Sequence, residues 1–240
     1  GKIVRYIPNG VDIDSIAAGN GQRFRNAQGI PNDAVLVGCI SRIDPQKNQR
    51  LLIDALDRIA DRHPTAQLLI AGPVTNEAYA SELKSRAAES HVSSRIRIIG
   101  SLDPLRGETA DAFRALDVFA LPSDHEPFGI VILEAWAAGV AVVSTDAGGI
   151  PSFTADGKDI LRVPCGDVAR FTECLDTVMK DKTLRLKLAS TGQSKAQRDY
   201  SWGTIGRQFI DLYRDAETWL FEHSKPFVIH RVFAASETPV

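Results

Sequence analysis

The sequence is poor in cysteine and in clustered metal ligands. Its only cysteines are Cys39, Cys165 and Cys174, and no two of them have the CxxC spacing of a zinc or redox motif. An odd, scattered set of thiols is typical of a reducing compartment, so we expect a cytoplasmic location. His, Asp and Cys residues show no ligand spacing either, so we expect no metal ion and no bound cofactor.

The sequence also lacks charge imbalance and long apolar runs. Its 28 Lys and Arg residues nearly balance 30 Asp and Glu residues, which argues against a broad basic surface for nucleic acid. No stretch reaches the roughly 20 apolar residues of a membrane-spanning helix. The chain opens on GKIVRYIPNGVD rather than on Met, so we interpret it as a fragment whose N-terminal part is absent.

Short apolar runs alternate with amphipathic helical patterns through the middle of the chain. The expected strands are 35–40, 67–71, 95–100, 118–121 and 141–144, and the expected helices are 47–60, 111–116, 129–138 and 168–189. Because the strands are continuously apolar, we predict an α/β, Rossmann-like doubly wound parallel sheet of about six strands. Ligands of such sheets bind at the carboxyl ends of the strands.

The C-terminal part differs from this pattern. Residues 181–198 are polar and rich in Lys and Arg, and we expect them to form a solvated helix end. Residues 201–219 have the spacing of an amphipathic helix. We therefore expect a ligand-binding domain at 1–200, followed by a helix and tail at 201–240.

Two cations flank the turn after the first strong strand, in SRIDPQKN. Arg42 and Lys47 lie where free backbone amides and the helix dipole already favour an anion, and two added cations suit a diphosphate. The alternative is that both are solvated surface residues.

Two carboxylates follow the strand at 118–121. Glu126 lies in the loop, whereas Glu134 lies on a helix that is otherwise apolar. An unpaired buried carboxylate costs several kcal/mol, so Glu134 needs a partner. A ribose with two hydroxyls is one such partner, and a buried Arg or backbone amides are the other. His125 precedes Glu126, but a lone loop His is more often structural or solvent-facing.

Paired glycines follow the strand at 141–144. Gly148 and Gly149 in DAGGIP could form an amide-lined concavity for phosphate, or an ordinary turn. Both interpretations stay open at this point.

Taken in order, these segments resemble family 4 of the retaining glycosyltransferases. Glu126 and Glu134 have the EX7E spacing of that family, and the resemblance covers about residues 3 to 216. Such enzymes have the GT-B architecture, two Rossmann-like domains facing across a cleft, and this chain matches the C-terminal, donor-binding one. The landmarks are Asn9-Gly10-Val11-Asp12, Ser41-Arg42 with Lys47-Asn48, Glu126-Pro127-Phe128-Gly129 with Glu134-Ala135, and Gly148-Gly149-Ile150-Pro151.

The resemblance implies an activity and a set of partners. The enzyme would transfer a hexose from a nucleotide diphosphate sugar, its donor substrate, to an acceptor hydroxyl in polysaccharide or glycolipid assembly. An acceptor sugar or lipid-linked glycan would be held by the missing N-terminal domain, on which residues 201–240 would pack. Peripheral membrane association through that domain stays open. The isolated chain would bind donor without turning it over.

The resemblance also assigns roles around the diphosphate and the ribose. Arg42 and Lys47 would hold the diphosphate and neutralise its growing charge without a metal ion. Glu134 would accept hydrogen bonds from the ribose. Glu126 would contact the donor sugar beside the bond that breaks, which places it with Arg42 and Lys47 among the catalytic residues.

The remaining donor contacts come from backbone groups and a loop. Amides of Phe128, Gly129 and Ile130 would meet sugar and phosphate, and Leu102 and Asp103 would contact the base. One departure concerns Ser152, where the family often has Glu, and it puts in doubt the orientation of the loop that holds Gly148 and Gly149.

Other functions are weighed against missing motifs. The turn SRIDPQKN contains no glycine, which argues against the GxGxxG of a dehydrogenase, and GxxxxGK[ST], GxSxG and HExxH do not occur. A GT-B epimerase or phosphorylase and a non-catalytic nucleotide-sugar-binding subunit stay open as alternatives. The sequence does not reveal the donor base, the sugar or the acceptor.

Overall fold

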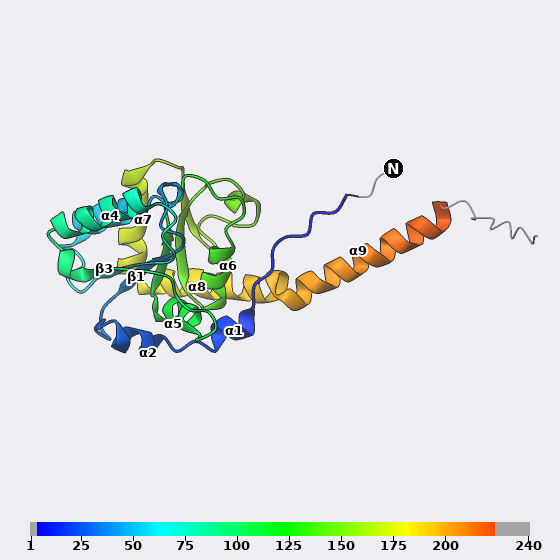
Figure 1. Cartoon of the computed structure of the whole chain (residues 1–240), viewed down its shortest axis with the longest axis horizontal. Coiled ribbons are helices and arrows are strands. Elements are labelled where there is room, and N and C mark those ends of the chain that lie inside the picture. The colour runs from blue at the N-terminus through cyan, green and yellow to red at the C-terminus, as the bar shows by residue number, and fades with distance from the viewer. Residues whose placement is uncertain (1–3, 224–240) are drawn as a thin grey trace, which may run out of the picture.

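The computed structural model describes residues 4–223, and in it a six-stranded parallel sheet has the order β3-β2-β1-β4-β5-β6. The predicted Rossmann-like fold is therefore confirmed (Figure 1). The strands are β1 (Leu36–Ile40), β2 (Gln67–Ala71), β3 (Ile96–Ile99), β4 (Val118–Leu121), β5 (Ala141–Thr145) and β6 (Leu161–Val163).

Helices cover both faces of this sheet (Figure 1). Helix α3 contacts α4 and α7 on one face, whereas α5 contacts α1 and α2 on the other, where α1 also contacts α6. The helices are α1 (Ile13–Ala17), α2 (Gly21–Ala27), α3 (Arg50–Ile59), α4 (Glu77–Glu89), α5 (Glu108–Ala115), α6 (Ile130–Ala137), α7 (Val168–Lys180), α8 (Lys182–Lys195) and α9 (Trp202–His223).

The central strands owe their position to uninterrupted apolar sequence. Every residue of β1, β2, β4 and β5 is buried. Strand β1 pairs along its whole length with β2, from Leu36 opposite Gln67 to Ile40 opposite Ala71, and on its other side Val37 lies opposite Val118 of β4. The loops after β1 and β4 therefore emerge side by side at the carboxyl edge of the sheet.

The predicted helix at 168–189 is in fact two helices. Asp181 ends α7 and begins α8, because its backbone amide donates to the carbonyl of Thr177 while its side chain accepts from the amide of Leu184 at 2.9 Å. The expectation of a solvated helix end at 181–198 is wrong for one face of α8, where Leu188 is fully buried. Gly192 allows this face to pack closely, since a side-chain carbon there would lie 2.3 Å from the indole ring of Trp136.

Several elements were not predicted from the sequence. Helix α4 is mostly polar and alanine-rich, and α2 buries only Phe24, so neither has a strong apolar stripe. Strand β6 has three residues and is only partly buried. Helix α5 begins at Glu108 rather than at residue 111, directly after Gly107, whose φ of 74° is left-handed. These elements are held by their neighbours rather than by their own periodicity.

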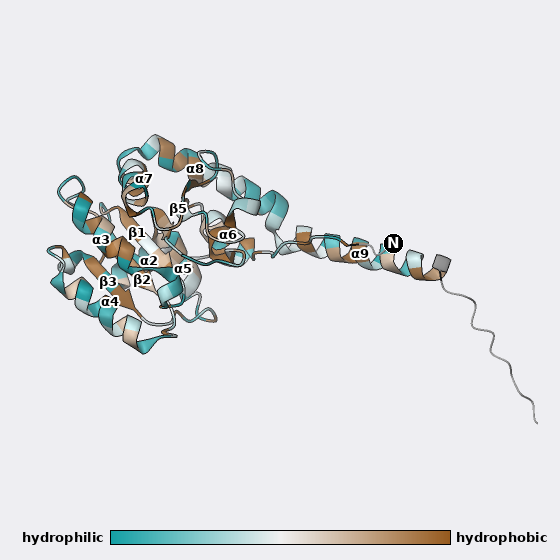
Figure 2. Ribbon diagram, turned by 90° about the horizontal axis from the view of Figure 1, so that it is seen from above, coloured by the Kyte–Doolittle hydropathy of each residue, from teal (hydrophilic) through white to brown (hydrophobic). Residues whose placement is uncertain are grey.

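Helix α9 confirms the helix predicted at 201–219 and projects from the body of the domain (Figure 1). The N-terminal segment runs beside it, and Arg5 forms an ion pair with Asp215 at 2.5 Å. The hydropathy of α9 alternates along the ribbon (Figure 2), and large apolar side chains such as Tyr213 are exposed. Most of the predicted tail, 224–240, lies outside the described residues, so the domain boundary at 200 stays a prediction.

Among residues 4–223, no helix is long and apolar enough to cross a membrane.

Candidate functional site

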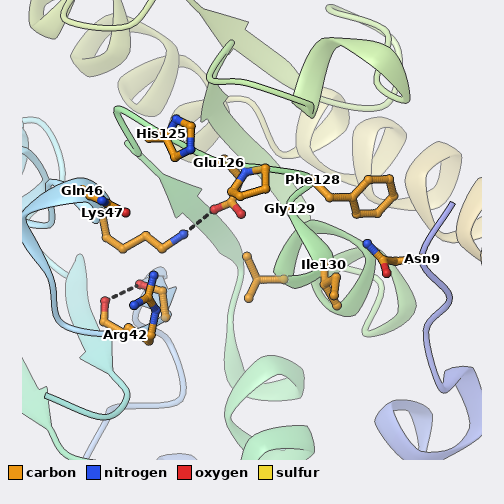
Figure 3. A pocket seen from close by; sticks show the side chains of 12 residues that line it. Asn9, Arg42, Gln46, Lys47, His125, Glu126, Phe128, Gly129 and Ile130 are labelled. Atoms are coloured by element: carbon orange, nitrogen blue, oxygen red, sulfur yellow. Dashed lines mark hydrogen bonds and ion pairs between the residues drawn. The ribbon is translucent and has the colours of Figure 1, made fainter. Parts of the chain in front are cut away.

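A pocket of about 410 Å³ opens at the carboxyl ends of β1 and β4. The structure brings together there six of the residues predicted from the sequence, and Figure 3 labels all of them. Those six are Arg42, Lys47, Glu126, Phe128, Gly129 and Ile130. The sequence did not single out Asn9 and Gln46 as ligand contacts, and both also line the pocket.

The loop after β1 is shaped by local caps. Asp44 accepts the backbone amide of Gln46 at 3.0 Å, which lowers the pKa of Asp44 and begins a short 3-10 turn at Pro45–Lys47. The turn ends at Asn48, whose φ of 50° is left-handed. Arg42 is exposed and forms no ion pair with any carboxylate in residues 4–223. Its guanidinium is therefore available to an anion.

Lys47 and Glu126 form a buried ion pair across the pocket (Figure 3). Each side chain is only 10% exposed. The same two loops are joined by the backbone amide of Asp124, which donates to the carbonyl of Gln46 at 2.9 Å. Sequence reasoning assigned Lys47 and Glu126 to different parts of a ligand and did not anticipate that they contact each other.

Gln49 is a supporting residue that sequence reasoning missed. It is fully buried, and its side-chain amide donates to the carbonyl of Arg42 at 2.7 Å and to the hydroxyl of Ser41 at 3.1 Å. Gly72 allows the next strand end to approach, since a side-chain carbon there would lie 2.0 Å from the carbonyl oxygen of Ser41. The backbone beside Arg42 is thus held from two sides. The sequence signal that could have identified Gln49 is its position as a polar residue directly before the apolar stripe of α3.

The start of α6 presents unused backbone donors to the pocket. Gly129 precedes the helix with a φ of 101°, which favours glycine. The amides of Gly129, Ile130 and Val131 donate to no backbone acceptor among residues 4–223. Free amides at a helix start attract an anion, and all three residues line the pocket.

Gly148 and Gly149 support the Glu126 loop from behind. A side-chain carbon at Gly148, whose φ is 51°, would lie 2.1 Å from the carbonyl oxygen of Glu126. The amide of Gly149 donates to that same oxygen at 2.9 Å. This amide is already used within the protein, and neither glycine lines the pocket, so their contact with a ligand stays a prediction. Ser152 bonds within its own loop, to the carbonyl of Gly149 at 2.6 Å.

Glu134 lies in an adjoining pocket of about 310 Å³, which shares Ile130 with the first. Burial raises the pKa of its carboxyl group. Within residues 4–223, the carboxylate makes no hydrogen bond and no ion pair. Within this part of the chain, therefore, neither an Arg nor a backbone amide satisfies Glu134.

Leu102 and Asp103 are not brought to either of these pockets. Leu102 lines a separate pocket of about 400 Å³ beside α2 and α5. Asp103 is engaged locally, since its carboxylate accepts the amide of Leu105 at 2.9 Å. Pro104 of the same loop does share the pocket of Glu134. His125 is exposed and lines the first pocket.

The family model described as "Glycosyl transferases group 1" matches residues 20–195. This chain belongs to that family. It is 31% identical over 221 residues to D-inositol 3-phosphate glycosyltransferase of Corynebacterium efficiens, covering 90% of this chain and 51% of the relative. It is 32% identical over 213 residues to phosphatidyl-myo-inositol mannosyltransferase of Mycobacterium tuberculosis, covering 86% of this chain and 53% of that relative. The chain thus spans about half the length of these glycosyltransferases.

Solved structures share the fold. HepE of Anabaena, in complex with UDP-glucose, matches with a TM-score of 0.79 and 26% identity, over 88% of this chain and 57% of that one. The C-terminal domain of LpcC, a group 1 glycosyltransferase of Francisella tularensis, matches with a TM-score of 0.71 and 26% identity, over 80% and 100%. The chain has the Rossmann-like fold of one half of the GT-B architecture.

Replacing Glu134 by Gln should stabilise the ligand-free domain at neutral pH. A raised pKa means that the folded state holds this proton more tightly than the unfolded chain, so stability falls as pH rises above the ordinary value of 4.5 through the raised one. Urea unfolding across pH should show E134Q more stable than wild type at neutral pH and equal to it below 4.5. Equal stability at every pH would contradict this account.

Proposed function

We propose that this chain binds the donor of a retaining hexosyltransferase, a nucleotide diphosphate sugar, which the whole protein uses to glycosylate an acceptor hydroxyl. The observation that carries the proposal is the carboxylate of Glu134, which has no partner within residues 4–223, next to a pocket where the Arg42 guanidinium forms no ion pair with any described carboxylate. A ribose offers the hydroxyl donors that Glu134 lacks, and a diphosphate offers the anion that suits Arg42. One ligand with both groups satisfies both sites.

The pocket chemistry suits the breaking of a sugar–phosphate bond. Arg42, Lys47 and the free amides at the start of α6 would neutralise charge as it grows on the leaving diphosphate. Glu126 would accept hydrogen bonds from the sugar hydroxyls. Because HepE is described in complex with UDP-glucose, a UDP-hexose is the first donor to test.

The names of the relatives support an acceptor with several hydroxyls. They refer to D-inositol 3-phosphate and to phosphatidyl-myo-inositol, so a phosphorylated polyol, a sugar or a lipid-linked glycan is proposed here. Transfer is preferred over epimerisation or phosphorolysis because these relatives are glycosyltransferases by name.

Replacing Glu134 by Ala should weaken binding of the free nucleoside diphosphate by about 1–3 kcal/mol, the range for losing a buried partner. Replacing Glu126 by Ala should instead weaken discrimination among sugars without weakening diphosphate binding, although it destabilises the fold by leaving Lys47 without its ion-pair partner. Calorimetry with UDP, GDP and ADP, and then with their sugars, measures both. Equal losses for both variants with both ligands would remove this division of roles.

Donor binding should survive removal of divalent metal ions. Arg42, Lys47 and the helix start supply positive charge where the diphosphate would lie. Calorimetry with EDTA should give the affinity measured without it. Binding that disappears with EDTA and returns with Mg²⁺ would show that a metal ion holds the diphosphate.

The chain alone should bind donor without appreciable transfer, because the relatives are about twice its length and the acceptor would be held by their other half. A transfer assay should compare the chain with a fusion that carries the N-terminal half of the Corynebacterium relative. Turnover only by the fusion is expected. Robust turnover by the chain alone would show that its site is complete.

A further inference from the structure

Three aromatic rings form a row that leads away from the pocket. Phe128, which lines the pocket, stacks on Phe153 with ring centres 4.7 Å apart and an angle of 16°. Phe153 then meets Tyr200 edge-on, at 6.0 Å and 67°. Trp136 supports Phe153 from the side at 5.8 Å. Phe153 is 6% exposed, so the row is part of the packed interior.

The far end of this row lies where two distant segments meet, residues 10–12 and residues 200–202, here called the crossing. The amide of Val11 donates to the carbonyl of Tyr200 at 2.8 Å, and the amide of Trp202 donates to the carbonyl of Val11 at 3.2 Å. Gly10 packs against Trp202, since a side-chain carbon at Gly10 would lie 2.7 Å from its ring. Tyr200 ends a π-helical turn, a feature that is frequent at functional sites.

Phe153 is also connected along the backbone to the loop that supports Glu126 in the pocket. It directly follows the short turn Ile150–Ser152, and this turn follows Gly149, whose amide holds the carbonyl of Glu126. A shift of the Phe153 ring would therefore change both the hydrogen bond from Gly149 to Glu126 and the ring contact with Tyr200. Close-packed interiors transmit such shifts because they contain few voids.

We propose that Phe153 is a positioning residue that couples the crossing to the donor pocket. The proposal rests on the proposed function only for the identity of the ligand. Coupling is reciprocal, so a change at Tyr200 alters donor affinity although Tyr200 does not line the pocket.

A double-mutant cycle tests the coupling. Y200L should weaken binding of UDP-glucose about two- to tenfold, the scale of one lost aromatic pair. Y200F keeps the ring and should bind as wild type does. In an F153L background, Y200L should have little further effect. Normal affinity of folded Y200L, or the same loss in both backgrounds, would overturn the proposal.

Hydrogen exchange provides a readout that needs no ligand. F153L should speed exchange of the Val11 amide, and Y200L should speed exchange of the Gly149 amide. F171L, a buried change on α7, is the control for general loss of stability and should affect neither amide selectively. Unchanged exchange at both amides would overturn the proposal, whether or not UDP-glucose binds. Failure of UDP-glucose to bind wild type would by itself contradict only the proposed function.

Discussion

The buried ion pair between Lys47 and Glu126 determines the shape of the pocket. It joins the loops after β1 and β4, two strands that are neighbours in the sheet although their sequences lie far apart. A buried pair is stable only while both partners remain, because either charge alone would be desolvated and uncompensated. The supports around it, Gln49 under one loop and the Gly148–Gly149 backbone under the other, hold the geometry that the pair requires.

Glu134 shows the opposite arrangement, one turn into helix α6. Its carboxyl group is partly buried and has no partner in the described part of the chain, so burial raises its pKa and its charged form destabilises the ligand-free fold. Native structures tolerate such violations chiefly at functional sites, where a ligand completes the missing bonds. Glu126 is paired and supports the structure of the pocket, whereas Glu134 has no partner in residues 4–223 and is the group suited to recognise a ligand.

Much of this fold could be predicted from the sequence because the central strands are apolar at almost every position. The same reasoning failed for β6 and α4, whose stability comes from neighbours rather than from periodicity. The sequence did predict that Arg42, Lys47 and Glu126 lie at one edge of the sheet. It could not show that Lys47 and Glu126 pair, since that depends on the register of β1 against β4. Local spacing likewise gave no sign that the Gly149 amide serves Glu126.

The pairing changes how the electrostatics of the pocket should be understood. Two free cations were expected, yet Lys47 is neutralised by Glu126, whereas Arg42 has no ion-pair partner in residues 4–223. A bound diphosphate sugar would offer Lys47 an anion and Glu126 hydroxyl donors, so each member of the pair could exchange its partner without being left alone. The desolvation of both charges is already present in the ligand-free protein. Binding then replaces one set of charge-assisted bonds by another, and selectivity lies in whether a ligand supplies both replacements.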